Sequence, residues 1–590
     1  MTYAPTSRNA HLASAETRAI ATLADVLSAV DSSERLTSRQ RQDMASAVRS
    51  VGRFLSRPLS TLPSDARSIR NLLEGIQPAR HDVSPGRWAN IRSLTFKALD
   101  HAGVRRLPGR SAAPPTQAWQ RLLQPLPYRP AQVALMPFAR HCSRQGVEPH
   151  RVDQETFEAF ARELEEFGAR SRPREGYLDA CRAWQHARRT YPHWPTFAVR
   201  VEDRRDRYAL AWSTFPPSLK ADVDAMAEGA VSPDVLSPTS RKPIKPVSAA
   251  SRVSLLRAFA SAIVLKGRDP ATLRTIADLV LADAARSGLE FMLDRAGGRK
   301  TPHIHQMAKL LCTLARHHVY GRITDLGPEA RKAAEINIAE LDDFRRSLDP
   351  GRHGMTAKNR TTLRWFEDEA LVAKFLSLSA RLLRRHQTRR KPKVSEAVQL
   401  QTGLAVEILT VAPIRCKNLV EIRLDENIID HGSGRQRRVH LYFAAEHVKN
   451  GTELEFELRP STVHLLDHYV AHVRPRLLRS PSPYLFPGVS GSHKKGMLLS
   501  QQIADLVEAE VGVRLTAHQF RHLAGFLFLR DNPGGHEVVR RLLGHKSIET
   551  TIRFYAGMEV AEAVRHYDKH VANLRAGMIA PMRRQRRDSR

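Results

Sequence analysis

The chain has 590 residues, of which 93 are Lys or Arg and 61 are Asp or Glu, so its formal net charge is +32 at pH 7. That length suits about three or four domains, each able to bury a core. With 42% apolar and 26% charged residues, the chain is neither disordered nor collagen-like, and no stretch approaches the ~20 uncharged apolar residues of a membrane-spanning helix. The positive charge predicts a polyanionic partner. Nucleic acid is favoured over an anionic membrane surface because neutralising phosphates releases condensed counterions.

The cysteines and the N-terminus indicate an intracellular protein. The four cysteines are scattered, with neither a Cys-x-x-Cys pair nor the spacing of metal ligands: Cys142, Cys181, Cys312 and Cys416. The first residues lack the apolar segment of a secretory signal. We therefore expect reduced thiols and no structural zinc site.

Two helical regions precede the last third of the chain. Apolar residues at three-to-four spacing predict a helical domain over 1–105, and the Pro-, Gly- and Ser-rich segment 106–117 predicts a linker. A second helical region spans 118–350 and could divide again at the Pro-, Ser- and Lys-rich stretch 232–248.

The last third, residues 358–575, mixes helices with short β-like runs. Alternating apolar and polar residues on both sides of Asn450-Gly451 predict a β-hairpin, because both turn residues tolerate positive φ. The end of the chain, 576–590, is predicted to be a basic tail. The expected fold class is therefore mainly α and multi-domain, with helical N-terminal domains followed by a mixed α+β domain that contains a small sheet.

Four places in this last third supply the groups that phosphodiester chemistry needs. Breaking and rejoining such a bond takes a side-chain nucleophile, cations at the non-bridging oxygens and a general acid for the leaving 5′ oxygen. In chain order the candidates are Arg415 at a helix start opened by Pro413, Lys449 beside the Asn-Gly turn, His518 and Arg521 on one helix face, His545 after Leu543-Gly544, and Tyr555. Taken singly, each residue also fits a role without chemistry, such as a solvated surface cation or a tyrosine of the core.

As an ordered set, these residues resemble the catalytic domain of the tyrosine recombinases, or phage-integrase family. The matching pattern is an early Arg, a hairpin Lys, His-x-x-Arg-His, Leu-Gly-His and then Tyr, over about residues 358–575. The resemblance implies that Tyr555 attacks a DNA phosphate and forms a 3′-phosphotyrosyl link. It implies further that Arg415 and Arg521 bind the non-bridging oxygens and that Lys449 protonates the leaving oxygen.

The remaining implied roles concern the histidines and the partners. His518 would assist proton transfer around the nucleophile, and His545 would donate a hydrogen bond to the phosphate. The resemblance implies no metal or nucleotide cofactor, double-stranded DNA as the partner without a membrane, and a homo-tetramer on paired sites. By the same analogy, 118–350 would clamp the duplex and 1–105 would bind DNA or a partner.

Two features depart from the family pattern or compete with it. The family often has Thr-Gly-Leu-Arg with a carboxylate three residues later, whereas here the sequence is Ala-Pro-Ile-Arg and the later residue is Asn418. That change removes an expected support of Arg415. Tyr567, the only tyrosine after Tyr555, is the competing nucleophile.

The sequence thus predicts a site-specific DNA recombinase or integrase of a mobile element, with resolution and transposition roles left open. The alternative is a catalytically silent DNA-binding protein that keeps the fold. A basic RNA-binding or scaffold protein is the remote third reading. The expected location is the cytoplasm of a bacterial-type cell, in association with the nucleoid.

Overall fold

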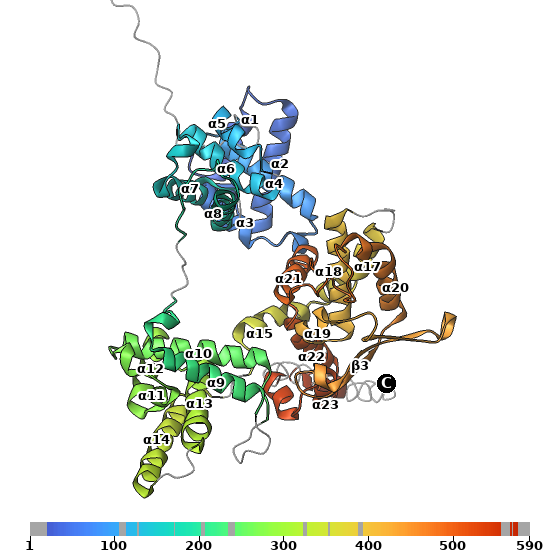
Figure 1. The fold of residues 1–590 in the computed structure, drawn as a ribbon. Helices are drawn as coiled ribbons and strands as arrows, with labels where there is room; N and C mark the ends of the chain where they lie inside the picture. The colour runs from blue at the N-terminus through green and yellow to red at the C-terminus, as the bar shows by residue number, and fades with distance from the viewer. Residues whose placement is uncertain are drawn as a thin grey trace, which may run out of the picture. The chain divides into compact units, whose positions relative to one another are not determined.

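The structure is a computed structural model. It describes residues 20–104, 114–126, 129–169, 172–201, 207–233, 242–322, 327–351, 354–386 and 393–555, and a few residues between 564 and 575. The predicted tail at 576–590 and most of the predicted linker at 106–117 lie outside these residues. The chain forms two compact units, one of residues 1–201 with 354–590 and one of residues 202–353. The described residues are mainly helical and contain one three-stranded sheet, which confirms the predicted fold class (Figure 1).

The first helices of unit 1 pack around a small apolar core. They are α1 (Leu23–Asp31), α2 (Ser38–Leu55), α3 (Ala66–Gly75) and α4 (Pro85–His101). Thr22 caps α1 and Thr37 caps α2, each through a reciprocal capping box with the third residue of its helix. The buried apolar face of each helix packs against the other helices. The caps therefore set where the helices begin, and the spacing of apolar residues sets which face is buried.

The next helices of unit 1 enclose an aromatic core. They are α5 (Gln117–Leu123), α6 (Arg129–Arg144), α7 (Gln154–Phe167) and α8 (Pro173–Thr190). Trp119, Phe138, Phe157 and Trp184 are fully buried, and the rings of Phe138 and Phe157 stack with centroids 4.1 Å apart. Buried Arg70 of α3 donates to Gly168 O at 2.8 Å and Glu165 O at 2.7 Å, so it satisfies the open end of α7 and joins the two cores.

Unit 2 has its own core, separate from that of α5–α8. Its helices are α9 (Pro217–Val231), α10 (Pro246–Leu265), α11 (Ile276–Val280), α12 (Ala282–Arg295), α13 (Pro302–Leu314) and α14 (Pro328–Ser347). The region predicted as 118–350 therefore contains two cores that separate near residue 202, and the stretch 232–248 connects α9 to α10 within one of them. A Pro-rich segment marks a surface connection as readily as a domain boundary. The DNA-binding roles assigned to these regions stay predictions.

Helix α10 is long and apolar enough to cross a membrane by length and composition alone. It carries Arg252 and Arg257, however, and its side chains Leu256, Phe259 and Ile263 are buried in the core of unit 2. These features are those of a core helix.

The last part of the chain builds a helical domain with the sheet at one side (Figure 1). Its helices are α15 (Ala357–Arg364), α16 (Glu369–Leu376), α17 (Leu378–His386), α18 (Val394–Val411), α19 (Cys416–Val420), α20 (Pro460–His468), α21 (Gly496–Val511), α22 (Gln519–Asp531) and α23 (His536–Leu543), and residues 548–555 are also helical. Helix α18 lies at the centre, because it contacts α17, α20, α21 and α22 and is buried along most of its length.

The sheet is antiparallel in the order β1 (Ile428–His431), β2 (Arg438–Phe443) and β3 (Leu454–Glu457). Phe443 pairs with Leu454, which confirms the hairpin predicted around Asn450-Gly451. Gly451 has a φ of 65°, whereas the φ of Asn450 is not positive, so the expectation of positive φ at both residues is wrong for Asn450. The connection is longer than a two-residue turn, because residues 444–453 carry a short 3₁₀ segment before it.

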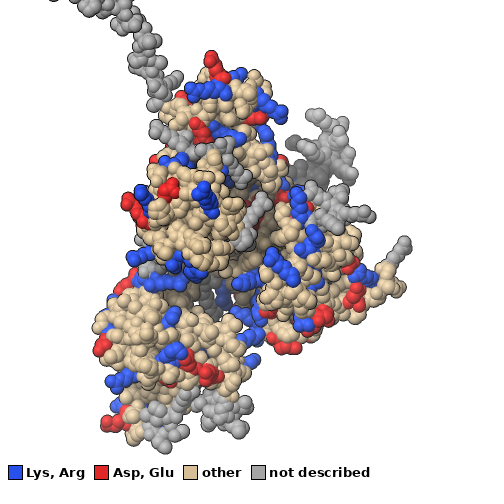
Figure 2. Space-filling view, turned by 45° about the horizontal axis from the view of Figure 1, so that its top comes forward, with Lys and Arg blue, Asp and Glu red and all other residues tan. Residues whose placement is uncertain are grey.

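The N-terminal helices and the last domain meet within unit 1 through residues 77–82. The Arg80 guanidinium lies 3.6 Å from the ring centroid of Trp365 and donates from Nε to Gly512 O at 3.0 Å. Lys374 donates to Asp82 at 2.9 Å. Some of the positive charge of this chain therefore holds its own parts together, while Figure 2 shows many more Lys and Arg side chains spread over the visible surface.

We predict that Phe259→Ala selectively destabilises unit 2. Phe259 is 0% exposed and packs against the backbone at Gly288, so its loss should cost about 3–5 kcal/mol. Hydrogen–deuterium exchange on the full chain should show lost protection in α10 and α12 only. The matched control is Val247→Ala on the same helix, which is 82% exposed and should change protection little. Equal effects of the two variants would contradict this packing.

Candidate active site

The Arg521 guanidinium is the most buried cation of the predicted site. It is 5% exposed and lies on α22, one turn after His518, which precedes the helix. It donates to Pro413 O at 2.6 Å and to Leu543 O at 2.5 Å. Burial, and next the charge of Arg415, lower its pKa to about 10, which still leaves it charged at neutral pH. Arg521 thus joins the segment before α19 to the end of α23.

The Leu-Gly-His turn ends α23 as the sequence predicted. Gly544 has a φ of 58°, which a glycine adopts at low cost. Three successive carbonyls of the turn accept hydrogen bonds from three different side chains: Leu543 O from Arg521, Gly544 O from Asn450 and His545 O from Arg540. The turn that carries His545 is therefore held from α22, from the hairpin connection and from its own helix.

Arg415 is half-buried and stands immediately before α19, which begins at Cys416. The helix therefore starts after Pro413 rather than with it, which corrects the predicted helix start. Arg415 donates to the side-chain oxygen of Asn450 at 3.2 Å, and burial lowers its pKa. No carboxylate in the described part of the chain forms an ion pair with Arg415 or Arg521. Two unneutralised guanidiniums in one site favour an anion such as a phosphate.

Three histidines surround the two arginines in neutral form. Burial, together with nearby positive charge, lowers the pKa of His545 and that of His522 to about 4, and lowers the pKa of His518 as well. His545 Nδ1 lies 2.9 Å from the Thr551 hydroxyl. His518 and His522 contact each other edge to face at 5.2 Å. Neutral imidazoles can accept or donate a proton, so the chemistry predicted for them is available at neutral pH.

Tyr555 lies inside the domain, against α22. It is 1% exposed, and its hydroxyl donates to Arg521 O at 3.2 Å. Burial raises its pKa above the ordinary value, although Arg521 opposes the shift, so the phenol is protonated at rest. Tyr567 is 67% exposed and makes no hydrogen bond with the site among the described residues. The geometry favours Tyr555 over Tyr567.

Lys449 lies beside the cluster without touching it. Its side chain is exposed at the hairpin connection and forms no hydrogen bond or ion pair with any described residue, whereas its neighbour Asn450 contacts Arg415. The structure therefore brings together Arg415, His518, Arg521, His545 and Tyr555, and leaves Lys449 at the rim. Their catalytic roles stay predictions.

Several residues of the site were missed from the sequence. Asn450 was seen only as a turn residue, His522 only as a neighbour of Arg521, and Thr551 not at all. Asn418 was noted as a missing carboxylate, but its amide donates to His447 O at 3.1 Å and so holds the hairpin connection. Each of these residues acts through a contact with a residue from another segment, which the sequence does not show. Their position within or beside the recognised motifs was the one signal that could have pointed to them.

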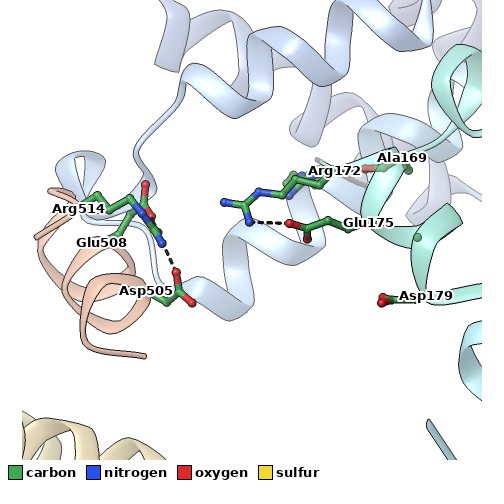
Figure 3. Close-up of a pocket in the computed structure, with 9 residues that line it drawn as sticks. Ala169, Arg172, Glu175, Asp179, Asp505, Glu508 and Arg514 are labelled. Atoms are coloured by element: carbon green, nitrogen blue, oxygen red, sulfur yellow. Dashed lines mark hydrogen bonds and ion pairs between the residues drawn. The ribbon is translucent and has the colours of Figure 1, made fainter. Parts of the chain in front are cut away.

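A separate hollow of about 620 Å³ lies within unit 1, between α8 and α21. Its lining includes cations and carboxylates that pair within each wall: Arg172 with Glu175, and Arg514 with Asp505 (Figure 3). None of the predicted catalytic residues lines it. The charged side chains of this hollow are therefore paired within its own walls.

Comparison by sequence identifies the domain. Residues 381–561 match the phage integrase family, so this part of the chain is a phage-integrase, or tyrosine-recombinase, domain. No curated protein matches the chain in sequence.

Among solved structures, the chain is similar to XerH site-specific recombinase bound to difH substrate, at 11% identity over 59% of this chain and 94% of that one, with a TM-score of 0.29. It is also similar to a lambda integrase(75–356) dimer bound to a COC′ core site, at 15% identity over 56% and 93%, with a TM-score of 0.34. The XerA recombinase matches at 14% identity over 54% and 98%, with a TM-score of 0.22.

We predict that Gly525→Ala displaces Tyr555. A Cβ at this position would lie 2.4 Å from the Tyr555 hydroxyl oxygen, so the ring must leave its cavity, at a cost of about 1–3 kcal/mol. Nitration by tetranitromethane, mapped by mass spectrometry, should become faster at Tyr555. Gly496→Ala is the control, since its Cβ would meet only Cys416 Sγ at 3.6 Å. Unchanged nitration in folded Gly525→Ala would contradict this placement of the ring.

The buried histidine predicts a pH dependence of stability. Because the pKa of His522 is lowered to about 4 in the folded state, the unfolded chain binds the proton more tightly, and stability is lost as pH falls from about 6.5 to 4. At pH 5 the contribution of His522 is up to about 2 kcal/mol. Denaturant unfolding at pH 7 and pH 5 should show a smaller loss for His522→Gln than for wild type. Exposed His464→Gln serves as the control, and equal losses in all three proteins would refute the assignment.

Proposed function

We propose that the chain is a site-specific DNA recombinase or integrase of a mobile element, acting through Tyr555. The observation that carries the proposal is the pair of unneutralised guanidiniums, Arg415 and Arg521, next to a buried tyrosine and neutral histidines. The phage-integrase domain at 381–561 supports DNA strand breakage and rejoining as the class of reaction.

In the proposed step, the Tyr555 oxygen forms a bond to phosphorus while the bond between phosphorus and the 5′ oxygen breaks. Arg415 and Arg521 hold the charge that grows on the non-bridging oxygens. The phenol proton passes toward His518, and Lys449 gives a proton to the leaving oxygen, so a 3′-phosphotyrosyl link and a 5′ hydroxyl result. Rejoining reverses these transfers, and no bond energy is lost.

The resting position of Tyr555 adds a requirement to this step. Its hydroxyl donates a hydrogen bond to the backbone carbonyl of Arg521, so the helical segment 548–555 must shift before the tyrosine reaches a phosphate. The pKa of the phenol is raised in that buried position, so leaving it also makes deprotonation easier. We infer that binding of DNA supplies the free energy for this movement.

The proposed partner is double-stranded DNA, on which a homo-tetramer would pair two sites. Exposed Lys and Arg on the helical units would supply salt-sensitive contacts to phosphates. Four unpaired cysteines agree with the reducing cytoplasm proposed as its location.

The buried tyrosine favours one other reading, a DNA-binding protein that keeps the fold without cleaving. The two readings differ in their covalent product. A cleaving enzyme traps itself on a nicked suicide substrate, whereas a silent protein binds the same DNA and releases it in SDS.

We predict that the wild-type chain forms an SDS-resistant adduct on a nicked suicide substrate carrying the ends of its element. Tyr555→Phe should lower the rate of adduct formation by more than about 10³-fold, because the nucleophilic oxygen is gone. Tyr567→Phe is the control and should react like wild type. Adduct from Tyr555→Phe would refute the nucleophile, and wild type that binds a confirmed site without any adduct would favour the silent protein.

A further inference from the structure

We infer that Asn450 is a positioning residue that aligns Lys449, the proposed general acid, with Arg415 and with the turn that carries His545. The inference rests on the proposed function and deepens it. It starts from the fact that one side chain contacts two catalytic elements that are far apart in sequence.

Asn450 uses both ends of its amide. The oxygen accepts from Arg415 at 3.2 Å, and the NH₂ group donates to Gly544 O. A guanidinium can only donate and a carbonyl can only accept, so the two partners fix which end of the amide faces which. No other orientation of the Asn450 amide satisfies both groups, so the hairpin connection is tied to the residue before α19 and to the end of α23 together.

The same connection is held a second time on the other side of Lys449. Asn418 of α19 donates to His447 O at 3.1 Å, and Val448 is buried in the core of the domain. Lys449 therefore stands between an anchored Val448 and an anchored Asn450, while its own side chain stays free. This arrangement fixes the backbone of Lys449 and leaves only its side chain free to move toward a proton acceptor.

The alignment matters because two groups must reach one phosphate. Arg415 would bind a non-bridging oxygen while Lys449 protonates the 5′ oxygen of that phosphate. An error of about 1 Å in such a geometry costs roughly 10²-fold in rate. Since Asn450 follows Lys449 directly and contacts Arg415, it sets the distance between the backbones of the two catalytic residues.

A neutral amide also suits this place better than a carboxylate. A carboxylate at position 450 would pair with Arg415 and neutralise part of the charge that the phosphate requires. The two amides hold the hairpin connection by hydrogen bonds alone. At position 418, where the family often has a carboxylate, this chain has an amide that holds the hairpin connection through His447 O.

The test compares two leaving groups on the suicide substrate, a 5′ oxygen and a 5′ bridging sulfur. A thiolate leaves without a proton because thiols are far stronger acids than alcohols. On the oxygen substrate, Lys449→Ala should slow adduct formation by about 10²-fold or more, and Asn450→Ala by about 10- to 100-fold. On the sulfur substrate both variants should return to within a few-fold of wild type.

The controls separate positioning from other losses. Arg415→Ala should stay slow with sulfur, because its charge is needed for either leaving group. Thr452→Ala lies in the same connection, where the side chain is exposed and has no hydrogen-bond partner among the described residues, and it should behave like wild type on both substrates. Asn450→Gln keeps a neutral amide with both donor and acceptor, but its extra methylene shifts the hairpin connection relative to Arg415 and Gly544 O, so it should be slow with oxygen and rescued by sulfur as well. It therefore carries the test if Asn450→Ala fails to fold.

Each outcome bears on the inference. If both Asn450 variants stay equally slow with oxygen and sulfur, Asn450 does not act through Lys449 and the inference is overturned. The same holds if Asn450→Ala cleaves the oxygen substrate at the wild-type rate. Absence of adduct from wild type on either substrate would instead remove the proposed function itself, so the two failures can be told apart.

Discussion

The rest of the site depends on how the charge of Arg521 is buried. A guanidinium without a carboxylate partner is costly to bury, by several kcal/mol in ordinary interiors. Here the cost is offset by two backbone carbonyls, Pro413 O and Leu543 O, which stabilise the cation without cancelling its charge. Because those carbonyls belong to the two segments that carry Arg415 and His545, the same hydrogen bonds that make the buried charge tolerable also assemble the site. Loss of the Arg521 side chain would therefore disturb geometry and charge at once.

An unneutralised positive site sets the protonation of its neighbours. Burial, and next the nearby positive charge, lower the pKa of His518, His522 and His545 and hold all three in neutral form. Burial acts in the opposite direction on Tyr555 and keeps its phenol protonated, with the hydroxyl on the carbonyl of Arg521. The site therefore combines two guanidiniums with neutral histidines and a buried, protonated phenol. An incoming phosphate would relieve the repulsion among the cations.

Much of this could be predicted from the sequence, for physical reasons that differ by residue. The hairpin was predicted from Asn450-Gly451 and the end of α23 from Gly544, because Gly451 and Gly544 both have positive φ, which glycine adopts at low cost. The identity of the site residues came from the order of motifs around Arg521 and Tyr555. The roles of Asn450 and Asn418 could not be predicted, since each depends on a contact made across the fold. The division near residue 202 was missed because one helical periodicity continues through two separate cores.

The net charge of +32 includes buried cations that cannot contribute to affinity for DNA as surface cations do. Arg70, Arg474 and Arg521 are buried and donate to backbone carbonyls, so they hold segments of the fold and are shielded from counterions. Counterion release counts the phosphates that surface cations neutralise, so these three contribute little to the salt dependence of binding. Arg521 differs from the other two in having Arg415 beside it: burial, and next the charge of Arg415, lower its pKa, and the two unneutralised guanidiniums favour an anion. A buried arginine that only donates to backbone carbonyls therefore has a structural role. A buried arginine with a second cation beside it indicates a phosphate site.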